Sequence, residues 1–361
     1  MLNESTRHRV LCGHAAAMND VADASIDLVV TSPPYPMVSM WDEVFRKEHS
    51  GIGAALDRGD GPRAFEAMHR VLDDVWLECH RVLKPGGLFC LNVGDATRKV
   101  GDEFRLYSNH ARILQTMRGL GFSILPDILW RKPNNSPTKF MGSGMLPGGA
   151  YVTYEHEYIL ILRKGNLRTF RSPADKARRR RSAFFWEERN LWFSDLWQGL
   201  TGVEQELSDK AARRRSAAFP FELAYRLILM HSVLGDVVLD PFLGTGTTMA
   251  AAVAAGRESV GVEQERGLMT TIDATLTASV APGLARGRRR LLDHLAFVAK
   301  CEEQGTSLSH VNETYGFPVM TRQEVLLEVV VPSEIVSEAP GVYTASHERA
   351  SCEGRQATFE V

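Results

Sequence analysis

Four residues that follow a short apolar run have the types needed to act on an amine: Ser32, Pro33, Pro34 and Tyr35. The preceding residues 26–31, IDLVVT, are typical of a buried strand. The two prolines fix φ and carry no N–H, so the Ser32 hydroxyl and the Pro33 carbonyl could accept hydrogen bonds from an exocyclic amine. Tyr35 supplies an aromatic face on which a base could stack outside its duplex. A proline-stiffened loop with a core tyrosine would show the same four residues, so this motif needs support from the rest of the chain.

That support comes from a glycine turn between two further strands. An apolar run over 236–240 ends in Asp240, turns through Gly244 and Gly246, and enters an alanine-rich helix at Thr247. Glycines allow a ligand close to the backbone, and a helix N-terminus offers unpaired N–H donors. Glu263 closes the next strand, where a carboxylate can accept hydrogen bonds from ribose hydroxyls. Together these features predict a site for an adenosyl nucleotide.

Two common nucleotide sites do not fit this turn. A phosphate-binding loop requires Lys where this chain has Thr247, and a dinucleotide fold requires a third glycine where it has Met249. A cofactor without phosphates needs neither residue. S-adenosylmethionine is such a cofactor, and we expect Asp240 to hold its ammonium group directly or through water.

The elements around both motifs alternate between strand and helix, which predicts an α/β fold with a parallel, doubly wound sheet. We expect strands at 8–13, 26–31, 88–93, near 122–130, 153–162, 236–240 and 258–263, with helices over 62–83, 103–119, 219–232 and 247–255. Beyond about residue 280 the pattern weakens. RGRRR at 286–290 is predicted to open a helix, 324–331 is a strand candidate, and the last 25 residues are predicted to be poorly ordered.

The composition indicates a globular protein. The chain has 361 residues, of which 44% are hydrophobic and 24% charged, and it contains no apolar stretch long enough to span a bilayer. Five scattered cysteines without a CxxC pair argue against zinc and against a disulfide framework. Since the N-terminus also lacks a signal-peptide core, we expect a cytoplasmic protein that needs no metal and no membrane.

The net charge of −2 does not favour nucleic acid, but arginine is unevenly distributed. Between Arg163 and Asn190 there are ten basic and three acidic side chains. The guanidinium fork suits phosphate and guanine, so Arg178, Arg179, Arg180 and Arg181 are candidate DNA contacts. A solvated surface segment remains the alternative interpretation.

These motifs occur in the order typical of a known enzyme class. The sequence resembles the amino-methyltransferases of bacterial restriction-modification systems, in the group whose catalytic motif precedes the cofactor motif. TSPPY resembles the catalytic motif, and DPFLGTGTT with GVE resembles the cofactor motif. RVLKPGGLFCLNVGD, GFSILPDILWRKPN, EHEYILILRKG and RRSAAFPFELAYRLI resemble the intervening blocks, so the likeness covers about residues 8–270.

The resemblance implies a Rossmann-like, seven-stranded S-adenosylmethionine-dependent methyltransferase sheet, circularly permuted, with an inserted DNA target-recognition region. The implied divisions are a catalytic half at 1–140, a target-recognition region at 141–215, a cofactor half at 216–275, and an extension of unknown role at 276–361. The implied cofactor-binding residues are Asp240, Pro241, Phe242, Gly244, Gly246, Thr247, Thr248, Glu263 and Phe219. One departure stands out: the family usually has an acid, near the cofactor's adenine amine, where this chain has His14.

Within this class, Ser at the first motif position is commoner in cytosine-N4 enzymes and Asp in adenine-N6 enzymes. We therefore expect methyl transfer to N4 of cytosine in a short duplex sequence, by base flipping into a pocket closed around Tyr35 and Trp130. Such a protein would be the modification enzyme of a bacterial or archaeal restriction-modification system, paired in function with an endonuclease.

The alternatives divide into those the sequence opposes and those it leaves open. Methylation at carbon 5 of cytosine uses a cysteine after a proline, which this chain lacks, and glutamine methyltransferases resemble NPPY rather than SPPY. An adenine-N6 methyltransferase and a non-catalytic DNA-binding regulator both remain open.

Overall fold

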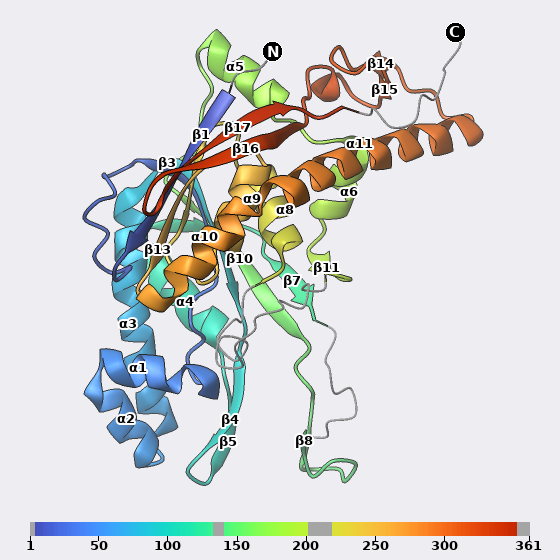
Figure 1. Cartoon of the computed structure of the whole chain (residues 1–361). Helices are drawn as coiled ribbons and strands as arrows, with labels where there is room; N and C mark the ends of the chain where they lie inside the picture. The colour runs from blue at the N-terminus through green and yellow to red at the C-terminus, as the bar shows by residue number, and fades with distance from the viewer. Residues whose placement is uncertain (1–3, 133–140, 201–218, 352–361) are drawn as a thin grey trace.

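The computed structural model describes residues 4–132, 141–200 and 219–351, and one large sheet organises them (Figure 1). Its strand order is β11-β7-β10-β3-β2-β12-β13-β1-β17-β16, with β6 paired to β10. The strands are β1 (Glu4–Cys12), β2 (Ile26–Thr31), β3 (Leu83–Val93), β6 (Phe122–Ile124), β7 (Ile128–Arg131), β10 (His156–Lys164), β11 (Leu196–Trp197), β12 (Val237–Asp240), β13 (Glu258–Glu263), β16 (Val330–Ala339) and β17 (Val342–Arg349).

The centre of the sheet is parallel. β3, β2, β12, β13 and β1 run in one direction, while β10 lies antiparallel to β3 and to β7. Strands buried on both faces read as continuous apolar runs, which is why IDLVVT is recognisable in the sequence. The seven neighbouring strands from β7 to β1 form the expected sheet, and β11 extends it at one edge while β17 and β16 extend it at the other.

Helices cover both faces of the sheet. Val29 of β2 joins the core under α3 (Gly61–Val82) and α4 (Asn109–Gly119), whereas Leu28 and Val30 join the core under α8 (Phe221–His231) and α9 (Thr247–Ala254). This alternation is the two-residue period of a strand buried on both sides. α10 (Met269–Thr277) and α11 (Val280–Glu303) pack beside α9 (Figure 1).

Three sequence predictions were wrong at the level of elements. The helix expected over 103–119 begins only at Asn109, because β4 (Ala96–Val100) and β5 (Glu103–Tyr107) form a hairpin before it. The strand expected at 324–331 begins at Val330 instead. RGRRR lies inside α11 rather than at its start.

The C-terminal segment also differs from its prediction. Residues expected to be poorly ordered include β17, which pairs antiparallel with β1 and with β16. Tyr343, Ala345 and His347 point inward in alternation, and small and polar residues among them hid the strand pattern. Residues 352–361 lie outside the described part. The segment 276–361 therefore contributes strands to the central sheet, and β10 does the same from within the proposed region 141–215.

Candidate active site

Two loops meet where the parallel strands β2 and β12 end, at the carboxyl edge of the sheet, and Asp240 joins them. Its Oδ1 accepts hydrogen bonds from Thr31 Oγ1 at 2.6 Å and from the Phe242 N–H at 3.0 Å. Its Oδ2 accepts from Thr248 Oγ1 at 2.5 Å. Burial raises the pKa of Asp240 to about 6, although hydrogen bonds from Thr248 and Thr31 act in the opposite direction. Oδ1 thus has two protein partners, whereas Oδ2, bonded by Thr248, keeps a lone pair that can accept from a ligand's ammonium group or from water.

The glycine turn has the shape expected for a nucleotide. Gly244 and Gly246 adopt positive φ values of 57° and 93°, and Gly246 caps α9. A Cβ on Gly244 would meet nothing closer than the Phe242 carbonyl at 4.0 Å, so there is room beside the turn. Glu263 receives the Gly244 N–H on Oε2 at 2.9 Å and the Glu265 N–H on Oε1 at 2.8 Å.

Burial raises the pKa of Glu263, while the N–H groups of Glu265 and Gly244 partly offset that shift. Each carboxylate oxygen has a second lone pair that can accept from a ribose hydroxyl. The turn, the N–H groups that open α9 and this carboxylate fit the adenosine part of S-adenosylmethionine.

The Ser32–Tyr35 loop forms a buried hydrogen-bond network. The Tyr35 hydroxyl lies 2.9 Å from Ser32 Oγ and donates to Glu157 Oε2 at 3.0 Å. Asn92 Nδ2 donates to both members of that pair, at 2.8 Å to Tyr35 and 2.6 Å to Glu157. Lys132 Nζ binds the other Glu157 oxygen at 2.5 Å. Burial and the Glu157 charge raise the pKa of Tyr35, so the phenol stays protonated.

The backbone fixes the tyrosine ring as well. A Cβ on Gly94 would lie 3.2 Å from Tyr35 Cε2, so the ring packs directly on the chain that leaves β3. Asn109 Nδ2 donates to the Pro36 and Gly94 carbonyls at 3.0 and 2.9 Å, which ties that chain to the loop. The loop is therefore held in place from three elements: β3, β10 and α4.

Asn92 and Glu157 were missed from sequence. Each has a local signal: Asn92 is the polar residue in the buried run LFCLNV, and Glu157 begins the otherwise apolar EYILIL. Since β10 runs antiparallel to β3, its first residues reach the same edge as the ends of the parallel strands. Only the pairing of these strands brings the two side chains to Tyr35.

His14, which stands where an acid was expected, has a carboxylate beside it. Its Nδ1 accepts from the Ala16 N–H at 3.1 Å, and its Nε2 lies 3.2 Å from Glu48 Oε2 at the end of α1 (Asp42–Glu48). The neighbouring Gly13 N–H donates to the Glu263 carbonyl at 3.0 Å. An acidic side chain thus lies against the His14 ring, supplied by a helix instead of by position 14.

The structure separates the predicted DNA contacts at 178–181 from this site. They lie on α5 (Pro173–Arg181), whose following residue, Ser182, accepts the Leu234 N–H before β12 begins. Arg181 pairs with Glu328 at 2.8 Å. The arginines therefore sit at the amino edge of the sheet, and Figure 1 shows α5 at the end opposite the β4–β5 hairpin.

Two predicted aromatic contacts are part of the core. Trp130 is 2% exposed and donates its indole N–H to the Leu200 carbonyl at 3.3 Å. Lys132 Nζ lies over its ring at 4.7 Å. Phe219 is also buried, in the cluster beneath α8. Both rings are buried, as is the Tyr35 ring at 8% exposure, so burial alone does not distinguish these rings as contacts for a base or a cofactor.

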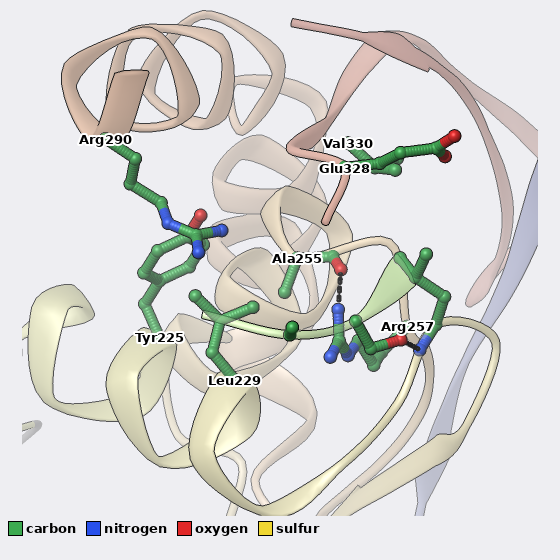
Figure 2. A pocket seen from close by; sticks show the side chains of 10 residues that line it. Tyr225, Leu229, Ala255, Arg257, Arg290, Glu328 and Val330 are labelled. Carbon is green, nitrogen blue, oxygen red and sulfur yellow. Dashed lines mark hydrogen bonds between the residues drawn. The ribbon is translucent and has the colours of Figure 1, made fainter. Parts of the chain in front are cut away.

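A small pocket lies on the amino side of the sheet, among α8, α11 and the start of β16 (Figure 2). Arg257 projects into it and donates to Ser232 Oγ at 3.0 Å and to the Ser232 carbonyl at 2.8 Å. Arg290 pairs with Glu188 at 2.6 Å. Protein groups therefore already bond the guanidinium groups of Arg257 and Arg290, which line the pocket. The pocket is separate from the candidate active site.

Two negative findings concern the described residues. Within them, no group of His, Cys, Asp or Glu has a metal-binding arrangement. None of their helices is long and apolar enough to cross a membrane.

Comparison with known proteins points to one family. A family model described as DNA methylase matches residues 26–273. The type II methyltransferase M.MthZI of Methanothermobacter thermautotrophicus is 50% identical over 328 residues, which is 91% of each chain. M.MjaI of Methanocaldococcus jannaschii is 45% identical over 280 residues, covering 74% of this chain and 91% of the relative.

Solved structures agree with the sequence relatives. TTHA0409 of Thermus thermophilus, solved with S-adenosyl-L-methionine, has a TM-score of 0.59 and 32% identity over 76% of this chain and 96% of its own. The cytosine-N4-specific PvuII DNA methyltransferase has a TM-score of 0.52 and 19% identity over 75% of this chain and 87% of its own. At that identity the second likeness concerns the fold alone.

Proposed function

This chain belongs to the DNA methylase family, as an S-adenosylmethionine-dependent DNA methyltransferase of restriction-modification type, and we propose that it methylates cytosine at N4. This proposal rests on the neutral hydroxyl of Ser32, the residue that directly follows β2. A hydroxyl can accept from the N4 amine and donate to the neighbouring ring nitrogen of cytosine, whereas a carboxylate could only accept. In the structure the Tyr35 hydroxyl donates to Glu157, so Ser32 Oγ donates to Tyr35 and keeps its lone pairs for an amine, and it must turn away from Tyr35 to donate to a ring nitrogen.

The proposed chemistry needs no covalent enzyme intermediate. S-adenosylmethionine supplies a methyl group on a positive sulfur. The lone pair of an exocyclic amine is delocalised into the ring, and acceptors at Ser32 Oγ and the Pro33 carbonyl draw its N–H bonds out of the ring plane. The nitrogen can then attack the methyl carbon as the carbon–sulfur bond breaks, and the product amine releases one proton to solvent. Positioning and electrostatics supply the rate.

The buried network gives Glu157 and Asn92 a positioning role in this proposal. A flipped base must stack on a ring whose plane is fixed, and the Tyr35 ring is fixed through its hydroxyl by both residues. Lys132 balances the Glu157 charge. Glu263 and the turn at Gly244–Gly246 would hold the adenosine part of the cofactor, and Asp240 would keep the two loops in register.

Mass spectrometry of nucleosides from duplex DNA treated with the enzyme and labelled cofactor tests the proposal. We expect N4-methylcytosine as the main product and a large loss of activity in Ser32→Asp. N6-methyladenine as the main product would move the target to adenine and leave the methyltransferase assignment intact. Absence of any methyl transfer by a folded, cofactor-binding protein would favour a non-catalytic DNA-binding regulator.

We propose, in addition, that an endonuclease acting at the same sequence is the functional partner of this protein. The support is the likeness to type II methyltransferases over most of the chain. DNA modified by this enzyme should resist cleavage by that nuclease, and unmodified DNA should not.

A further inference from the structure

One hairpin at the catalytic edge has an unusual composition. It joins β8 (Met141–Gly142) to β9 (Ala150–Tyr151) and projects from the sheet beside the β4–β5 hairpin (Figure 1). Residues 141–154, MGSGMLPGGAYVTY, include no charged side chain in a protein that is 24% charged. Met145 and Leu146 at its tip are 84% and 69% exposed. Exposed apolar residues gathered on a projecting element are typical of a binding surface.

The base of this hairpin is attached to the active site. The Tyr154 hydroxyl donates to Asp95 Oδ2 at 3.2 Å and lies 3.0 Å from the Tyr158 hydroxyl. Asp95 directly follows Gly94, on which the Tyr35 ring packs. On the opposite strand, the Lys132 N–H donates to the Glu155 carbonyl at 2.8 Å. The hairpin thus leaves the sheet within two residues of Glu157, so its base lies beside the residues that hold Tyr35.

The tip is an ordered turn. The Ser143 N–H donates to the Gly149 carbonyl at 2.8 Å, and its hydroxyl donates to the Leu146 carbonyl at 2.6 Å. Further down, the Tyr151 ring stacks on Phe104 of the β4–β5 hairpin, with ring centres 5.0 Å apart. Met145 and Leu146 are therefore presented on a braced support, which lowers the entropy lost on binding.

We propose that Met145 and Leu146 form an apolar wedge that enters the DNA duplex where the target base leaves it. The inference rests on the proposed base-flipping reaction, and it holds for either target base. A base that turns out leaves a gap between stacked neighbours, and proteins fill or open such steps with Met, Leu and similar side chains. A tip without charge is suited to contact stacked bases and not phosphates. Other residues must then contact the DNA backbone.

The dimensions suit this role. Seven residues lie between Leu146 and Tyr154, and the eight Cα–Cα steps of an extended chain span at most about 26 Å. The major groove is only about 8.5 Å deep, so the tip can reach the base stack while the hairpin base stays at the active site. Lys99, exposed on the neighbouring β4–β5 hairpin, lies on the element that Tyr151 contacts and can meet the phosphates alongside.

The test compares M145S/L146S with the matched control Leu167→Ser. Leu167 is 74% exposed but follows β10 at the amino edge of the sheet. The substrates are synthetic duplexes carrying the site that the enzyme modifies in its expression host, located by sequencing. In one duplex the target base is correctly paired, and in the other it faces an abasic position, which removes most of the cost of flipping.

We expect M145S/L146S to lower kcat/KM at least tenfold on the paired duplex and less than threefold on the abasic duplex. Leu167→Ser should change neither value more than twofold. Calorimetry should show unchanged affinity for S-adenosylmethionine in all variants, which also verifies folding. The single variant Leu146→Ala should show the same pattern with a smaller loss.

An equal loss on both duplexes would overturn the wedge, since it would indicate a general role in binding or folding. No loss on either duplex would also overturn it, as would a change of oligomeric state in M145S/L146S by sedimentation. The identity of the methylated nucleoside, measured in the same reactions, tests the proposed cytosine specificity separately.

Discussion

The two edges of the central sheet use charge in different ways. At the carboxyl edge, the carboxylates of Asp240 and Glu263 accept hydrogen bonds from hydroxyl and backbone N–H groups, and no basic side chain among the described residues pairs with them. At the amino edge, carboxylates pair with arginines, as in Arg168–Asp236 and Arg181–Glu328. Acceptors without a cation can still bind a ligand, whereas paired charges are already satisfied. Two arginines of the arginine-rich segment, Arg168 and Arg181, are therefore part of the protein's own structure, while Arg179 and Arg180 stay exposed.

The amino edge is held together by buried contacts to the C-terminal segment. Arg290 of α11 binds both oxygens of Glu188, at 2.6 and 2.8 Å, and both residues are buried. The Glu188 charge raises the pKa of Arg290 against the effect of burial. Glu324 accepts the Trp186 N–H at 2.8 Å from the same side. Each of these contacts joins α6 (Trp186–Trp192) to residues beyond 280.

Breaking the buried pair should give the largest effect on the molecule. Arg290→Met leaves the Glu188 carboxylate buried without its partner, which costs about 3–5 kcal/mol of unfolding free energy. Urea titration followed by circular dichroism measures this loss. The double variant R290M/E188L should recover most of the lost unfolding free energy. If it does not, the stability of the amino edge depends on the packing of these side chains more than on their charges.

At the carboxyl edge, Ser32→Ala should act on turnover and not on stability. Removing one preorganised group from the reacting amine should lower kcat by about 10²-fold, the scale for losing one such hydrogen-bond partner. The matched control is Ser25→Ala, just before the amino end of β2, which should leave kcat unchanged. A parallel loss of cofactor affinity in Ser32→Ala would show that the loop is structural.

Glu263→Gln should weaken S-adenosylmethionine binding by about 1–3 kcal/mol, the scale of a charge-assisted hydrogen bond. The control, Glu258→Gln, changes the amino end of the same strand and should not alter binding. Isothermal calorimetry distinguishes the two variants. Unchanged affinity in a folded Glu263→Gln protein would place the ribose elsewhere.

The same carboxylate should make cofactor binding dependent on pH. Burial raises the pKa of Glu263, and ribose hydroxyls bind its charged form. Affinity should therefore fall as the pH is lowered through the raised pKa of Glu263, and binding over that range should release protons. Asp240, with a pKa of about 6, adds to the same trend. Glu263→Gln should show a shallower pH dependence by calorimetry, and an identical slope would contradict this origin.

The smallest effect is expected for the arginines first chosen as DNA contacts. R179Q/R180Q removes two exposed charges at the amino edge. A lost phosphate contact would flatten the slope of log K against log salt by about 0.9, so we expect a change well below that value. DNA-binding titrations at several salt concentrations measure the slope. A clear flattening of this slope would indicate that the DNA duplex binds at the amino edge of the sheet. That result would contradict the contrast drawn between the two edges.

The parts of the site that were predictable are those encoded locally. Two features are recognisable within a short stretch of sequence: a buried strand followed by Ser-Pro-Pro-Tyr, and another buried strand followed by a glycine turn. The Tyr35 network is different, because Glu157 lies 122 residues away and Asn92 lies 57 residues away. No local pattern reveals such contacts, since they depend on which strands become neighbours.

Composition also did not reveal the ion pairs that two of the arginines make. A cluster of positive charge predicts a partner with negative charge, but it does not distinguish DNA from the protein's own Asp236 and Glu328, which pair with Arg168 and Arg181. Their partners lie far along the chain and become apparent only in the folded structure. The C-terminal strands were missed for a related reason, since β17 is an alternation of small and polar residues stabilised by β1.

The position of β1 has a consequence for synthesis of the chain. This strand is made first, yet both of its neighbours, β13 and β17, are made much later, and His8 bonds Ser259 across 251 residues. At about 5–20 residues per second, the ribosome needs roughly 10–50 s to provide that partner. During this interval β1 must wait unpaired. Its alternate residues Arg7 and Arg9 carry charge, which protects an unpaired strand from association, while Thr6 and His8 bond each other at 2.9 Å in the finished sheet. The strand that waits longest for its partners thus carries charges that oppose its association with other chains.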